Sequence, residues 1–186
     1  VGTSMVIARL LTPAEMGLYA VTMALLALVA TVRDMGAGQY LLQEKELTRE
    51  RIRAVWGVQL TVGVVLASAV AVLSGPMAAF YGEAGMRDIF LVLALNYLIN
   101  PFGSLTYAWL MREMRYDAVA VSRFCATTVG AVVSISLASH GYGAISLAWG
   151  SVCSTTVNAA MSSFFRPKHF PWLPGFREVR RVLSFG

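Results

Sequence analysis

Charged residues are absent from four long stretches of the chain, which cover residues 16–32, 54–82, 89–111 and 124–165. A helix needs about 20 mostly apolar residues to cross the hydrocarbon layer of a membrane, and it satisfies its own backbone hydrogen bonds there. The first three stretches each have the length of one crossing. The fourth has the length of two, and the turn-forming residues 139–143 divide it. The pattern predicts an all-α, polytopic membrane protein with five full spans.

Local sequence signals place the ends of these spans. Thr12-Pro13-Ala14-Glu15 is a capping box with proline at the first helical position, so it starts the second span. Ser74-Gly75-Pro76 closes the third span, and Pro101 kinks the fourth. Because the chain begins inside one apolar run and stops near the start of another, we expect a piece of a longer protein. The predicted order is a partial first span at 1–11, spans at about 16–42, 54–73, 89–111, 118–138 and 144–165, and a basic cytoplasmic connection at 166–186 that leads to the next span.

Composition agrees with a membrane protein. The chain is 13% charged and 57% hydrophobic, whereas a soluble domain is about 25% charged and 45–50% apolar. Cys125 and Cys153 both lie in uncharged stretches, so they predict neither a disulfide framework nor a metal site, and no cofactor is expected. The calculated pI of about 9.6 would also suit a nucleic-acid-binding protein, but the positions of the basic residues argue against nucleic acid as a partner.

The basic residues gather on one side of the predicted membrane. Because successive spans alternate in direction, the connections fall into two sets. One set, at residues 43–53, 112–117 and 166–181, carries 11 Lys and Arg residues, while the other has only Arg9 and Arg87 near it. Cytoplasmic loops carry the excess of Lys and Arg in membrane proteins, so we expect the first set to face the cytoplasm.

A few polar residues lie inside or at the margin of the predicted spans, where they are costly and therefore mark functional sites or packing contacts. Arg33 and its neighbour Asp34 precede the cytoplasmic loop by about ten residues; Arg33 would either bind substrate or reach the inner headgroups or an acidic neighbour. Arg123 would line a cavity or extend to the interface. Asn96 and Asn100 share one helix face, where they would contact sugar hydroxyls or form interhelical hydrogen bonds.

Five short motifs, in this order and spacing, resemble the polysaccharide-export branch of the multidrug/oligosaccharidyl-lipid/polysaccharide flippases, which export lipopolysaccharide and exopolysaccharide precursors. They are residues 8–19 (ARLLTPAEMGLY), 33–36 (RDMG), 100–103 (NPFG), 110–116 (LMREMRY) and 141–147 (GYGAISL). The resemblance covers nearly the whole chain. It implies a fold of two six-helix lobes with 12 to 14 spans in all, arranged around a cavity that opens alternately to each side. This chain would be the six-helix N-terminal lobe.

The resemblance also implies a function. Members of this branch move undecaprenyl-diphosphate-linked oligosaccharides across the cell inner membrane, before their assembly into O-antigen, capsule or exopolysaccharide, and they make or break no bond. The implied partners are the lipid-linked oligosaccharide, the lipid bilayer and the polysaccharide assembly machinery. Flippases of the superfamily often have an essential Arg in the helix that contains Arg33. Arg binds diphosphate well because its forked donors match the phosphate oxygens.

Three other classes of protein remain open at this stage. An ion-coupled multidrug antiporter of the same superfamily would use buried carboxylates, and Asp34 is the only acidic residue well inside a span. A membrane-embedded glycosyltransferase or polymerase would require a carboxylate-rich metal motif or a large outer loop, which the sequence lacks, so an enzyme is not expected. A purely structural helical subunit is disfavoured only by Arg33, Asp34 and the two asparagines.

Overall fold

The computed structural model describes residues 7, 9–34 and 49–165. The side chains of Arg33 and Asp34 lie outside the described part, as do the inner part of the second predicted span and the basic segment 166–186. The described ranges contain no strand, which confirms the all-α prediction. Their helices are α2 (Pro13–Asp34), α4 (Arg49–Tyr81), α5 (Ala84–Arg112), α6 (Tyr116–Ser139) and α7 (Ile145–Phe164).

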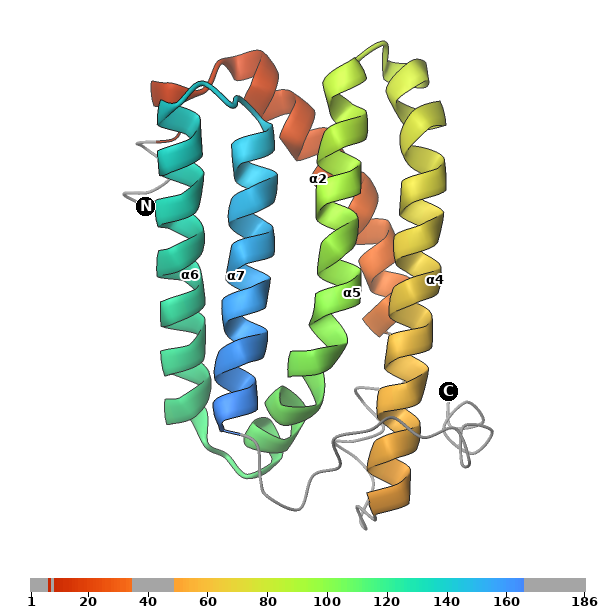
Figure 1. The fold of residues 1–186 in the computed structure, drawn as a ribbon, viewed down its shortest axis with the longest axis vertical. Helices are drawn as coiled ribbons and strands as arrows, with labels where there is room; N and C mark the ends of the chain where they lie inside the picture. The colour runs from red at the N-terminus through yellow and green to blue at the C-terminus, as the bar shows by residue number, and fades with distance from the viewer. Residues whose placement is uncertain (1–6, 8, 35–48, 166–186) are drawn as a thin grey trace.

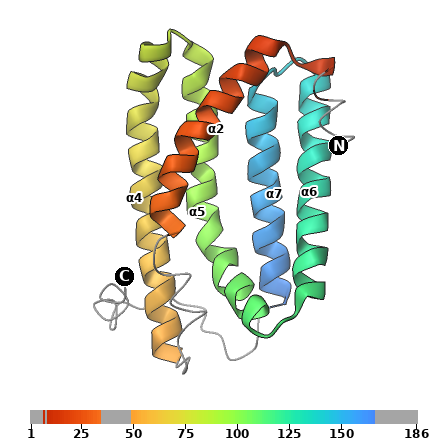
Figure 2. The same cartoon turned by 180° about the vertical axis from the view of Figure 1, so that it is seen from behind.

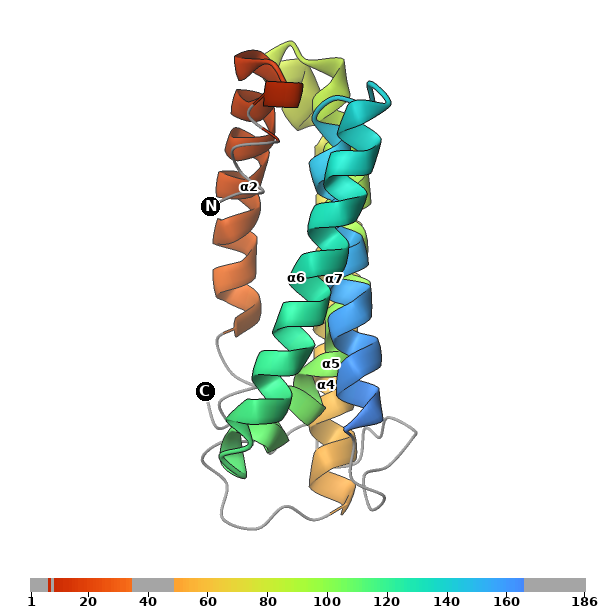
Figure 3. The same cartoon turned by 90° about the vertical axis from the view of Figure 1, so that its left-hand side faces the viewer.

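Four of the helices form one layer, and α2 crosses a face of that layer. Helices α4, α5, α7 and α6 stand side by side in this order (Figure 1). Helix α2 runs obliquely in front of them when the molecule is seen from behind (Figure 2). The layer is thin when it is viewed from its edge, with α2 on one side only (Figure 3). Helix α5 therefore packs against α4, α7 and, more lightly, α2.

The connections fall at two ends of the layer, as the alternation of spans predicts. The start of α2, the α4–α5 turn and the α6–α7 turn lie at one end, and the start of α4 and the α5–α6 turn lie at the other (Figure 1). Arg53, Arg112 and Arg115 lie at the second end, while Arg9 and Arg87 lie at the first. The assignment of the more basic end to the cytoplasm stays a prediction.

Four of these helices are long and apolar enough to cross a membrane, over Pro13–Thr31, Ile52–Tyr81, Ala84–Arg112 and Tyr116–Ser139. Helix α7 covers 20 residues of the last predicted span and is rich in Ser and Thr. Several of their hydroxyls donate to the backbone carbonyl four residues earlier, as Thr155 does to Ser151 at 3.0 Å and Thr156 to Val152 at 2.8 Å. These bonds satisfy the hydroxyls inside the helix, so α7 can pack between α5 and α6.

The main apolar core lies where α2, α4, α5 and the start of α7 meet. Met86, Ile89 and Leu93 of α5 are almost fully buried in it. From α2, Leu26 reaches the same core, and the hydroxyl of the buried Tyr97 donates to the Leu26 carbonyl at 3.1 Å. The tyrosine thus links α5 to the middle of α2.

Two prolines lie inside helices. The sequence predicted that Ser74-Gly75-Pro76 would close a span, whereas α4 continues past Pro76 to Tyr81. Proline removes only one backbone hydrogen bond, and the chain can pass it where neighbouring residues hold the helix. Pro101 lies inside α5 as predicted, and α5 changes direction in its second half (Figure 1).

The missing N–H of Pro101 has a consequence for packing between α4 and α5. The carbonyl that loses its helical partner is that of Tyr97, four residues earlier. This oxygen faces Gly63 of α4 so closely that a Cβ at Gly63 would overlap it. The glycine therefore allows α4 to approach this part of α5 closely.

Three helices end in the same kind of turn. At the end of α4, Glu83 N–H donates to the Ala78 carbonyl at 3.0 Å and Gly82 N–H donates to the Ala79 carbonyl at 3.3 Å. This is the Schellman pattern, in which the residue after the cap is left-handed, and Gly82 has a φ of 70°. The ends of α6 and α5 show the same pair of bonds. The left-handed residue is Gly141 after α6 but Met114 after α5.

We expect Met114→Gly to stabilise the protein. Met114 has a φ of 53° and is 75% exposed, so its Cβ causes strain that few packing contacts offset. Glycine removes a strain of about 1–2 kcal/mol but costs more backbone entropy, which leaves a net gain of about 0.5–1 kcal/mol. Thermal unfolding of the detergent-purified protein measures this gain. Gly82→Ala, at the equivalent position of the α4–α5 turn, should lower the melting temperature. A lower melting temperature for Met114→Gly would show that the side chain makes a stabilising contact.

Candidate functional site

Arg123 is held against an aromatic ring of the neighbouring helix. It lies in the second turn of α6 and is exposed. Its Nη2 donates to the hydroxyl of Tyr107 at 2.7 Å, and its guanidinium carbon lies 5.5 Å from the centre of the Tyr107 ring. The second half of α5, after Pro101, brings Tyr107 to this position. The arginine is thus oriented by a protein contact, with most of its five N–H donors still available.

Asn96 and Asn100 lie one turn apart on α5. The Asn96 amide donates to the Ser151 hydroxyl of α7 at 3.2 Å, which is the interhelical bond that the sequence left open as an alternative. Its carbonyl oxygen is buried and has no hydrogen-bond partner within the described residues. Asn100 is half-buried and makes no hydrogen bond within the described part of the chain. Asn96 therefore has a packing contact with α7 and a buried carbonyl oxygen, and Asn100 is the asparagine with polar groups available to a ligand.

A second polar contact joins α4 to α5 near the Pro101 kink. The Ser104 hydroxyl lies 2.6 Å from Oε1 of Gln59 and 3.2 Å from the Pro101 carbonyl. Both residues are half-buried. This contact engages the Gln59 carbonyl oxygen and joins α4 to α5, so it contributes to helix packing.

Arg33 and Asp34 form the last turn of α2. Their backbone is described, and α2 ends part-way along the layer, well short of the end where α5 turns into α6 (Figure 3). Because the Arg33 side chain lies outside the described part, a meeting of Arg33 and Arg123 stays a prediction. The position of α2 places Arg33 at a depth between the two ends of the bundle.

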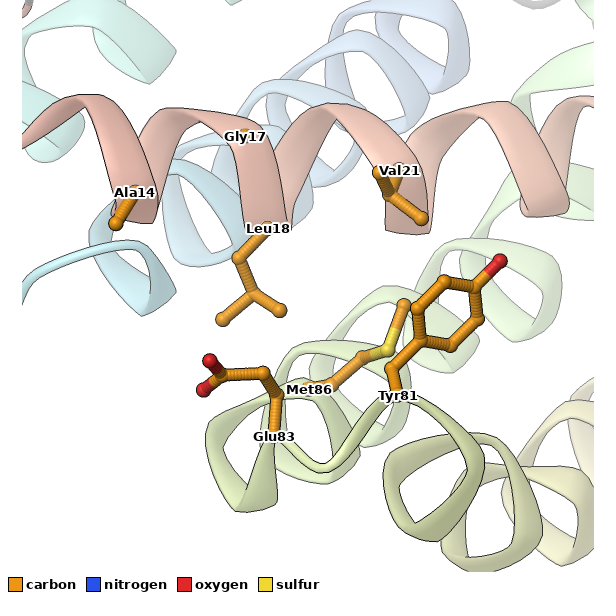
Figure 4. Close-up of a pocket in the computed structure, with 7 residues that line it drawn as sticks. All are labelled: Ala14, Gly17, Leu18, Val21, Tyr81, Glu83 and Met86. Carbon is orange, nitrogen blue, oxygen red and sulfur yellow. The ribbon is translucent and has the colours of Figure 1, made fainter.

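A hollow of about 170 Å³ lies between the first turns of α2 and the α4–α5 turn. No sequence pattern indicated it. The face of α2 from Ala14 to Val21 forms one side, and Tyr81, Glu83 and Met86 form the other (Figure 4). The one feature of the sequence that could have pointed to this hollow is the turn Tyr81-Gly82-Glu83, in which an aromatic and an acidic residue flank a glycine. Its partner surface on α2 is about 60 residues away in the chain.

The described residues show no metal centre. No group of three or more His, Cys, Asp or Glu residues in this part of the chain could hold a metal ion. Cys125 on α6 and Cys153 on α7 are free, half-buried thiols. The candidate site therefore consists of basic, amide and hydroxyl side chains, which bind anions and sugars by hydrogen bonding.

Comparison with known proteins identifies the family of this chain. A family model described as polysaccharide biosynthesis protein matches residues 6–186. The succinoglycan biosynthesis transport protein ExoT of Rhizobium meliloti (strain 1021) is 26% identical over 142 residues, which cover 76% of this chain and 29% of that protein. The lipopolysaccharide biosynthesis protein WzxC of Escherichia coli (strain K12) is 21% identical over 163 residues, which cover 88% of this chain and 33% of that protein.

A third relative is an uncharacterized membrane protein in the cps region of Klebsiella pneumoniae, 21% identical over 192 residues that cover 97% of this chain and 38% of that protein. No solved structure matches the chain. The chain spans about a third of the length of the curated relatives that it matches. The family match confirms the resemblance in the sequence motifs, because it extends over almost every residue. The chain belongs to the polysaccharide biosynthesis protein family.

Proposed function

We propose that the protein containing this chain is a flippase for a lipid-linked oligosaccharide, which it moves from the cytoplasmic to the outer leaflet of the inner membrane by alternating access. The observation that carries the proposal is the family match over residues 6–186. The names of two relatives, a succinoglycan transport protein and a lipopolysaccharide biosynthesis protein, support it. The substrate we propose is an undecaprenyl-diphosphate-linked repeat unit of a surface polysaccharide.

The charge of such a substrate dictates what the transport path must contain. A diphosphate and a hydrated sugar chain cannot enter hydrocarbon alone, so a carrier must provide cationic and hydrogen-bonding groups in a wet cavity. We assign the diphosphate to Arg33 and Arg123, and the sugar hydroxyls to Asn96 and Asn100. The contact of Arg123 with Tyr107 supports this role, because it orients the guanidinium and leaves most of its donors available.

We also propose partners and an orientation for the protein. Its partners are the lipid bilayer and the polysaccharide assembly machinery, and the more basic end of the bundle faces the cytoplasm. The transport step makes and breaks no covalent bond, so the protein is not an enzyme. An ion-coupled multidrug antiporter is not favoured, because the chain belongs to a polysaccharide biosynthesis family.

Depletion of the full-length protein in its own organism tests the proposed function. We expect the lipid-linked oligosaccharide to accumulate on the cytoplasmic face of the membrane and surface polysaccharide to fall, because the carrier acts between synthesis and assembly. Lipid extraction with mass spectrometry measures the intermediate, and its protection from externally added periodate locates it. Re-expression of the protein is the control. Sensitivity to drugs without any accumulated intermediate would contradict the proposal and favour the antiporter.

A further inference from the structure

The hollow beside the α4–α5 turn has the position required of a site for a hydrated ligand. It lies at the end of the helices, where α2 begins and α4 turns into α5 (Figures 1 and 4). A volume of about 170 Å³ holds on the order of ten water positions, which is room for one six-membered sugar ring. It lies at the less basic end, which the charge pattern places outside the cytoplasm.

Glu83 supplies an uncommitted carboxylate to this hollow. Two glutamates lie near helix starts at this end of the bundle. Glu15 is used in the capping box, where Thr12 N–H and the Thr12 hydroxyl both donate to Oε2 at 2.8 Å. Glu83 occupies the cap position of α5 but makes no side-chain capping bond. Its exposed carboxylate has no hydrogen bond or ion pair within the described residues.

Tyr81 and Met86 complete the hollow around this carboxylate. Met86 is fully buried and lies between the Tyr81 ring and the Glu83 carboxylate (Figure 4). Tyr81 is 44% exposed, so part of its ring is free. The left-handed Gly82 reverses the chain between these two residues. The α2 side is widened at Gly17, where a Cβ would meet no atom within 4 Å.

We infer that this hollow is a sugar-binding site, which receives one ring of the oligosaccharide at the outer end of the transport path. This inference rests on the proposed function. The Glu83 carboxylate accepts hydrogen bonds from two adjacent sugar hydroxyls. The C–H face of the sugar ring packs on the exposed part of the Tyr81 ring, which the buried Met86 lies against.

The alternative ligand of an aromatic residue beside a carboxylate is an organic cation. Such a cation gains most from an ion pair that excludes water, and the open position of Glu83 does not provide one. An exposed ion pair contributes about 0–1 kcal/mol. Sugar hydroxyls retain favourable hydrogen bonds in wet surroundings. The open, water-accessible hollow therefore favours a sugar.

Calorimetric titration of the full-length protein in lipid nanodiscs tests the inference. The probe is the soluble repeat unit released by mild acid from the organism's own surface polysaccharide, without lipid or diphosphate. We expect Tyr81→Ala and Glu83→Gln each to weaken binding about tenfold, because each removes one of the two principal contacts. Tyr81→Phe keeps the ring and should weaken binding less than Tyr81→Ala.

Asp88→Asn and Tyr142→Ala are the matched controls. Both residues are exposed at the same end of the bundle and neither lines the hollow. Both variants should therefore bind the repeat unit as tightly as the unmodified protein does. The inference is wrong if the unmodified protein does not bind the repeat unit, or if Tyr81→Ala and Glu83→Gln bind it as tightly as the controls do. It is also wrong if tetraphenylphosphonium binds instead and Glu83→Gln abolishes that binding.

This titration separates the two proposals. It uses a sugar that carries no lipid anchor, so it measures the hollow independently of transport. If the repeat unit is not bound but depleted cells accumulate the lipid-linked intermediate, only the sugar site is refuted. If depleted cells accumulate no intermediate, the flippase proposal fails regardless of the titration.

Discussion

Arg33→Ala is expected to abolish surface polysaccharide while the amount of full-length protein in the membrane stays unchanged. The reason is that the diphosphate group must lose water as it enters the transport path, and a fixed cation has to replace that hydration. Arginine binds both phosphates through its planar fork, whereas lysine offers one compact charge. Arg33→Lys should therefore retain part of the activity.

The depth of Arg33 in the bundle is the reason to expect a large effect on export. Helix α2 ends at Asp34 part-way along the layer (Figure 3), so the backbone of Arg33 lies between the two ends of the bundle. A charged residue at such a depth is costly, and it is retained where it serves a pathway or a partner. In addition, α2 is the least buried of the four apolar helices, which leaves much of its surface available to a substrate or to other parts of the protein.

Arg115→Ala is the matched control for Arg33→Ala. Arg115 is exposed in the α5–α6 turn, and its only described ion pair, with Asp117 at 3.9 Å, is also exposed. Such a pair contributes little, so export should be normal. Quantification of surface polysaccharide, together with immunoblotting of membranes, gives both readouts. Normal export by Arg33→Ala would remove Arg33 from the proposed path.

Features with a local cause could be predicted from the sequence. The capping box is one, because its two partners are three residues apart. Thr12 N–H donates to Glu15 and Glu15 N–H donates to the Thr12 hydroxyl at 3.3 Å. The helical character of the apolar stretches is another, since it follows from the energetics of a single segment in lipid.

Features that depend on two distant segments could not be predicted. Ser151 bonds Asn96 across 55 positions of the chain, and no sequence pattern indicates this pair. The contact between Tyr107 and Arg123 depends on the direction of α5 after its kink, so no sequence pattern indicates this pair. The hollow depends on how α2 crosses the layer, which the tertiary packing decides. The roles of Arg33, Asp34, Asn96, Asn100 and Arg123 in substrate binding stay predictions.

Gly150→Val is expected to disrupt the packing of α6 against α7. Small residues on α6 are buried at intervals of four: Ala118, Ser122, Ala126, Gly130, Ser134 and Ala138. Membrane helices approach closely where such residues meet, because lipid provides no hydrophobic force to hold them together. A Cβ on Gly150 would lie 2.7 Å from the Gly130 carbonyl oxygen and would overlap the Ser134 hydroxyl.

The backbone carbonyl of Gly130 cannot rotate away as a flexible side chain would, so the two helices must move apart. Overpacking of this kind costs about 1–3 kcal/mol or more. We expect the melting temperature of the purified protein to fall by about 5–10 °C. The separation should also increase alkylation of Cys125 and Cys153, the half-buried thiols of these two helices.

Gly17→Val separates the effect of packing from the loss of a glycine. Gly17 is exposed inside α2, and a Cβ there would meet no atom within 4 Å. Valine at this position removes only a flexible residue from a helix, so the melting temperature should be unchanged or slightly higher. If Gly150→Val and Gly17→Val melt alike and leave both thiols equally protected, the close contact between α6 and α7 does not hold the bundle together. A loss confined to Gly150→Val would show that the close fit of α7 against α6 stabilises the bundle.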